Sequence, residues 1–102
     1  MSTIANQLTV TPEADAYIDE IGMRGTYERM LKHIPEHYQG LQSIAVTLGL
    51  DYEEGGPPTV LFEVMRDDPG EYDGADGHWD RWVIENFHPD QFRHFVVLSF
   101  RT

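Results

Sequence analysis

Apolar and polar residues alternate at helical spacing in the N-terminal part of the chain. Between residues 12 and 21 the apolar positions fall three and four residues apart, on one face of a helix: Ala14, Tyr17, Ile18 and Ile21. Thr11 suits the N-cap, Pro12 the first helical position and Gly22 the end of the last turn. The pattern therefore predicts a helix over residues 12–21.

A second apolar stripe with the same spacing begins after Thr26, which suits an N-cap. It consists of Tyr27, Met30, Leu31 and Ile34. Pro35 then removes an amide donor and disfavours helical backbone at the residue before it. We expect this helix to end near His33, or to kink there and continue for one more turn to Tyr38.

Alternation with a period of two predicts a β-hairpin in the middle of the chain. Over residues 41–52 one face is apolar and the other carries small or polar residues; the apolar set is Ile44, Val46, Leu48, Leu50 and Tyr52. A turn at 53–58, rich in Gly and Pro, leads to a return strand over 59–66. A short strand at 7–10 and a strand at 95–100, apolar on both faces as in a sheet interior, complete the set.

Residues 77–87 fit a helix better than a strand. A helix places four large apolar side chains on one side: Trp79, Trp82, Val83 and Phe87. A strand would instead divide them between its two faces. We therefore predict a helix that Pro89 ends, with Trp82 and Phe87 in the core, followed by a helical turn at 89–92.

These elements predict one small α+β domain over residues 1–102, with a mainly antiparallel sheet of three to four strands. The two N-terminal helices should cover the sheet face that carries Ile44, Val46 and Leu48. The opposite face should carry Leu61, Met65, Phe95 and Val97. We expect the helix at 77–87 to cover that second face, and another copy of the chain or a partner protein is the alternative.

The net charge of the chain limits which classes of partner it can bind. Eighteen acidic residues against seven basic ones give a net charge of −11, which repels nucleic acid and anionic membranes and attracts cations or basic proteins. The absence of cysteine excludes disulfides, thiolate metal sites and thiol nucleophiles. We find neither a secretory signal pattern nor an apolar run long enough for a membrane helix, and we expect a cytoplasmic protein.

The stretch 67–80 contains six acidic residues and no Lys or Arg. Neither of its EF-hand registers, with Gly74 or Gly77 at the sixth position, puts acids at both the first and the third positions. We interpret the stretch as a docking site for a basic partner, with two exposed aromatic residues beside the acids. The predicted contact residues are Asp67, Asp68, Glu71, Tyr72, Asp73, Asp76 and Trp79. The alternatives are a solvated loop without a function, or an irregular calcium site formed by Asp73, Asp76 and Asp80.

The segment HIPEH at 33–37 matches the H-x-x-E-H pattern, in which two His ligands and a Glu base serve a zinc hydrolase. However, Pro35 lies inside the motif, and a third ligand must come from elsewhere. Alternatively, His33 and His37 face solvent near a helix C-terminus, where the helix dipole favours them. A site with two His and one carboxylate requires the fold to gather a scattered set: His78, Asp80, His88, Asp90 and His94.

The chain contains no nucleophile elbow, P-loop or dinucleotide fingerprint, and we assign no catalytic residue, metal ligand or cofactor. The favoured interpretation is a non-catalytic acidic domain that docks on a basic protein, as a small inhibitor, immunity-type or antitoxin-like protein does. The alternative is a metal-binding protein or metal-dependent hydrolase that uses His33, Glu36 and His37. A homodimer through the second sheet face is a third interpretation.

Overall fold

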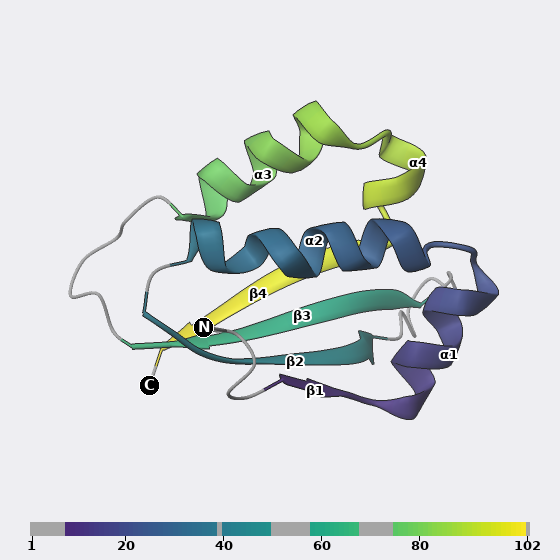
Figure 1. The fold of residues 1–102 in the computed structure, drawn as a ribbon, viewed down its shortest axis with the longest axis horizontal. Coiled ribbons are helices and arrows are strands. Elements are labelled where there is room, and N and C mark those ends of the chain that lie inside the picture. The colour runs from purple at the N-terminus through teal and green to yellow at the C-terminus, as the bar shows by residue number, and fades with distance from the viewer. Residues whose placement is uncertain (1–7, 39, 50–57, 68–74, 102) are drawn as a thin grey trace.

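The computed structural model describes residues 8–38, 40–49, 58–67 and 75–101 (Figure 1). It confirms the α+β class and shows eight elements in these ranges: β1 (Leu8–Val10), α1 (Pro12–Glu20), α2 (Arg24–His37), β2 (Leu41–Gly49), β3 (Thr59–Arg66), α3 (Ala75–Asn86), α4 (Pro89–Phe92) and β4 (Phe95–Arg101). No helix in these ranges is both long enough and apolar enough to cross a membrane.

The four strands form one sheet in the order β1-β2-β3-β4. The predicted hairpin is confirmed, because β2 and β3 pair antiparallel with Val46 opposite Phe62. The expectation of a mainly antiparallel sheet is wrong, since β1 pairs parallel with β2 and β3 pairs parallel with β4. Parallel neighbours need a long crossover, and the helix pairs α1–α2 and α3–α4 supply the two crossovers.

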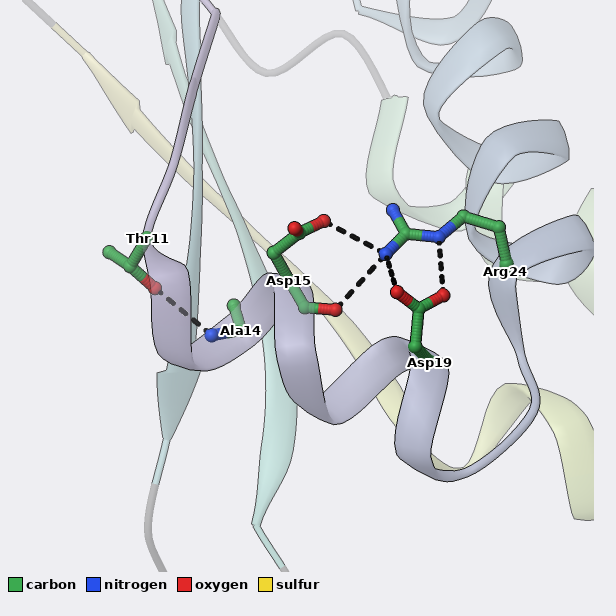
Figure 2. A network of polar contacts seen from close by, with 5 residues as sticks. All are labelled: Thr11, Ala14, Asp15, Asp19 and Arg24. Carbon is green, nitrogen blue, oxygen red and sulfur yellow. Dashed lines mark hydrogen bonds and ion pairs between the residues drawn. The ribbon is translucent and has the colours of Figure 1, made fainter.

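The first helix begins at Pro12 as predicted and ends at Glu20, one residue before the predicted end. The Thr11 hydroxyl accepts a hydrogen bond from the Ala14 amide at 3.3 Å, and Gly22 adopts a φ of 70° after the last turn. Arg24, the first residue of α2, then reaches back to α1 (Figure 2). Its guanidinium lies 2.8 Å from carboxylate oxygens of both Asp15 and Asp19. These contacts tie the start of α2 to α1.

The second helix differs from the prediction at both ends. It begins at Arg24 rather than after Thr26, whose side chain is buried. It also continues through Pro35 to His37, so the expected end near His33 is wrong and the extra turn is present. The Tyr38 amide donates to the Ile34 carbonyl at 3.1 Å, and both side chains are fully buried. Packing of this last turn offsets the donor that the proline lacks.

All the helices that reach the core lie on one side of the sheet (Figure 1). That face carries the buried residues Ile44, Val46, Val60, Phe62 and Val64. A helix forms here as predicted, from Ala75 to Asn86, one residue short of the predicted end, but α3 packs against α2 and does not cover the second sheet face. The predicted second face is also partly wrong. Phe95 and Val97 belong with the core, because they pair with Val60 and Phe62.

Candidate functional site

The structure describes the acidic stretch only in part. Four of the predicted contact residues lie outside the described residues: Asp68, Glu71, Tyr72 and Asp73. Only the backbone of Asp76 is placed, in the first turn of α3. Asp67 is exposed and tied to the start of β2: its amide donates to the Gly40 carbonyl at 2.8 Å, and its carboxylate accepts a hydrogen bond from Gln42. The docking role of this stretch therefore stays a prediction.

Trp79 is buried, so the expected exposure of its side chain is wrong. It is 5% exposed and belongs to the core cluster together with Val83 and Phe87. These three residues are four positions apart on α3, a spacing that indicates a single buried helix face. The ring of Trp79 therefore holds α3 against the core instead of standing exposed beside the acids.

His33 and His37 are half-buried, and both contact tryptophans of α3. The ring centroids of His33 and Trp82 are 4.4 Å apart, and those of His37 and Trp79 are 5.3 Å apart in an edge-to-face arrangement. The spacing of the two histidines, four residues apart, places both on the side of α2 that meets α3. Desolvation in this contact lowers the pKa of His37.

The geometry gives the metal hypothesis no support. His33 Nδ1 lies 3.5 Å from Glu36 Oε2, which is ion-pair distance when the imidazole is protonated. In the described ranges, no three His, Asp or Glu side chains gather closely enough to hold a metal ion. The scattered set of His and Asp is not brought together either. His88, for example, caps α4, where its Nδ1 accepts a hydrogen bond from the Asp90 amide at 3.1 Å.

An apolar surface lies on the sheet face opposite the helices. The parallel register places residues of β3 and β4 side by side there, and we call these six residues the open face: Leu61, Glu63, Met65, Val96, Leu98 and Phe100. Four of them are large hydrophobic residues that are 38–44% exposed: Met65, Val96, Leu98 and Phe100. Clustered exposed apolar residues of this kind mark a contact surface more often than single ones do.

Glu63 is the single charged side chain of the open face. It pairs with Leu98 on β4 and with Ala45 on β2. The Thr47 hydroxyl donates a hydrogen bond to Glu63 Oε2 at 2.8 Å, which holds the carboxylate in place. The open face therefore presents one oriented negative charge among hydrophobic side chains.

A hollow of about 430 Å³ borders the open face between α3 and β4, and we call it the edge groove. Val96 and Val97 both line it. Because consecutive strand residues point to opposite faces of a sheet, a hollow that touches both lies at the free edge of β4. Ile84, which is 65% exposed, and Asp80 line the groove from α3.

The open face and the edge groove share Val96, so they form one continuous surface. The sequence indicated a second apolar face but placed the wrong β4 residues on it. No family model, curated protein or solved structure matches the chain.

Proposed function

We propose that the protein is a non-catalytic interaction domain that binds a basic protein through its open face. The observation that carries the proposal is the group of exposed hydrophobic residues around Glu63. Burial of these side chains would supply affinity through the hydrophobic effect. A Lys or Arg of the partner, placed against the Glu63 carboxylate, would fix the orientation of the complex.

The charges favour a basic partner over a second copy of the chain. Each copy carries a net charge of −11, so two copies repel one another as they approach. Face-to-face contact would also remove Glu63 from water against the apolar residues of the other copy, which offer no cation. An unpaired buried carboxylate is costly, whereas a cationic partner removes that cost.

The acidic stretch fits this proposal as a steering element. Its charges would attract the basic partner from a distance and raise the association rate, while the open face would hold the complex. In its most concrete form, the domain is a small cytoplasmic inhibitor, immunity-type or antitoxin-like protein that covers the basic site of its partner.

The test is capture from a native lysate with three forms of the immobilised chain. Leu98→Asp places a charge on the open face, and Ala16→Asp places the same charge on an exposed position of α1 as the matched control. We expect wild type and Ala16→Asp to retain the same basic protein and Leu98→Asp to lose it. Raising the ionic strength to about 1 M, where the Debye length is about 3 Å, should weaken the capture.

Two results would contradict the proposal. Equal capture by Leu98→Asp and wild type would show that the open face is not the contact surface. If wild type retained no basic protein from a lysate of the cells that produce this chain, the proposed function would be ruled out.

A further inference from the structure

We propose that the partner binds as an extended basic segment that adds a fifth strand to the free edge of β4. This inference rests on the proposed function and specifies its mode of binding. The edge groove, the direction of the β4 backbone groups and the position of Asp80 carry it.

The backbone amides and carbonyls of β4 are oriented for pairing with an added strand. The Val60 amide donates to the His94 carbonyl at 2.8 Å, so the carbonyl of His94 points toward β3. In a parallel ladder the backbone groups of alternate residues point to the same side. Val96 and Leu98 therefore also face β3, whereas the amides and carbonyls of Phe95, Val97 and Ser99 point toward the free edge.

Within the part of the chain that the structure describes, β4 lacks the features that usually block strand addition. Natural proteins protect such edges with Lys, Pro, a bulge or very short strands. β4 spans seven residues and contains neither Lys nor Pro, and its pairing with β3 runs in register from Phe95 to Arg101. Among the described strands it pairs with β3 alone. An edge of this kind favours recognition by strand addition.

The edge groove provides room for the side chains of the added strand. Side chains on its helix side would enter the groove beside Val83 and Ile84, and those on its other side would extend the open face next to Leu98. Ile84 is 65% exposed, so α3 offers an apolar wall that the core does not use. The groove therefore selects a segment with alternating apolar residues.

Charge selects a basic segment. Among the described residues, Asp80 is the single charged residue that lines the groove, and Glu63 is the single charged residue of the six that form the open face. A Lys or Arg on the helix side of the added strand can reach the Asp80 carboxylate. A second copy of this chain would instead offer its own β4, which has no cation before its last residue, Arg101.

The probe is a phage library of random short peptides, selected on the immobilised full-length chain. We expect the enriched peptides to alternate apolar and polar residues and to carry Lys or Arg. A synthetic peptide of the enriched sequence should slow solvent exchange at the Val97 and Ser99 amides, measured by NMR. N-methylation of one set of alternate peptide amides should abolish binding, and N-methylation of the other set should leave it intact. The reason is that only one set faces β4.

Ser99→Pro removes one outward-facing donor and leaves the bonds to β3 intact, a position where an edge strand tolerates proline. We expect it to weaken peptide binding about tenfold, as loss of one hydrogen bond implies. Ser99→Val keeps the amide and should bind as wild type does.

Two further variants test the groove. Asp80→Asn and Ile84→Ala change exposed side chains and should leave the stability of the fold unchanged. Asp80→Asn should weaken a Lys-bearing peptide about threefold but not its Gln analogue.

Enrichment of acidic peptides or of none would overturn strand addition, as would binding that leaves the Val97 and Ser99 amides unprotected. A dimer in sedimentation that Ser99→Pro abolishes would assign the edge to a second copy instead. The lysate capture separates the two proposals. If Leu98→Asp loses the partner but Ser99→Pro and Ile84→Ala keep it, the proposed function holds and strand addition fails; loss in all three supports both.

Discussion

The imidazole ring of His33 lies 4.4 Å from the indole ring of Trp82, centroid to centroid, and His37 contacts the same indole at 5.6 Å. Two titratable rings of α2 thus hold α3 in place. Because α3 forms one wall of the edge groove, the protonation state of His37 bears on the shape of the proposed binding surface.

Acidification should weaken the contact between α2 and α3. Desolvation lowers the pKa of His37 below its ordinary 6.5, with His33 and His78 adding to the effect and Glu36 opposing it. The unfolded chain therefore takes up the proton first, so stability falls as the pH drops through 6.5. Denaturant unfolding followed by tryptophan fluorescence at about pH 7.5 and about pH 5 should show a larger loss in wild type than in His37→Gln.

The control for this measurement is His94→Gln, which changes a histidine outside the aromatic contact. It should lose as much stability on acidification as wild type does. If His37→Gln also matched wild type, the burial of His37 would not be coupled to folding.

Arg24 should stabilise the junction of α1 and α2 in a manner that depends on pH. Its hydrogen bond lowers the pKa of Asp19 below the ordinary 3.8. This contribution is fully present above pH 3.8 and is lost as the pH falls through the lowered value. Arg24→Gln should therefore be less stable than wild type at neutral pH, and chemical unfolding at about pH 7 and about pH 3 should show the difference shrinking. A difference that persists at low pH would assign the effect to packing of the Arg24 side chain.

Alanine substitutions of the two aromatic residues of β4 test which face of the sheet forms the core. Phe95 is 8% exposed and stacks on Phe62 with centroids 5.8 Å apart, whereas Phe100 on the open face is 44% exposed. Phe95→Ala should lower the free energy of unfolding by about 3 kcal/mol, and Phe100→Ala by about 1 kcal/mol or less. Equal losses in urea unfolding would mean that a part of the chain covers the open face.

Pro35 should be a tolerated defect of α2 rather than a structural requirement. Replacing it with alanine restores an amide donor and a residue of high helix propensity inside a helix that already runs to His37. Pro35→Ala should raise the free energy of unfolding by about 1 kcal/mol. A decrease would show that the partly buried proline ring contributes more through packing than the missing hydrogen bond costs.

Local patterns predicted most of the elements and little of their arrangement. Period-two alternation located the β2–β3 hairpin, and helical spacing located α1 and α3, because each pattern depends only on neighbouring residues. β4 is apolar on both faces, so its pattern could not say whether Phe95 or Val96 belongs to the core. The parallel pairings of the outer strands depend on where the crossover helices pack, which no local pattern records.

The sequence predicted that the candidate site would be an apolar sheet face, but it did not predict which residues form that face. The second apolar face was expected, yet only Leu61 and Met65 of its predicted residues lie on it. Trp79 was expected at the surface because it lies near the end of the acidic stretch, although its helical spacing with Val83 indicated burial. The edge groove had no signal in the sequence, because it arises where two elements distant in the chain meet.

The topology implies an order in which the parts of the sheet acquire their stability. The central strands β2 and β3 are joined by a short connection between Gly49 and Thr59, whereas each outer strand pairs only after the chain has formed a helical crossover. Pairings that close shorter loops lose less chain entropy and form earlier in folding. The hairpin should therefore form before β4 docks, and β4 should open more readily than the hairpin in the native state. If β4 detaches without unfolding the rest of the sheet, the edge of β3 is exposed for a time, and β3 can then pair with a strand from outside the chain in place of β4.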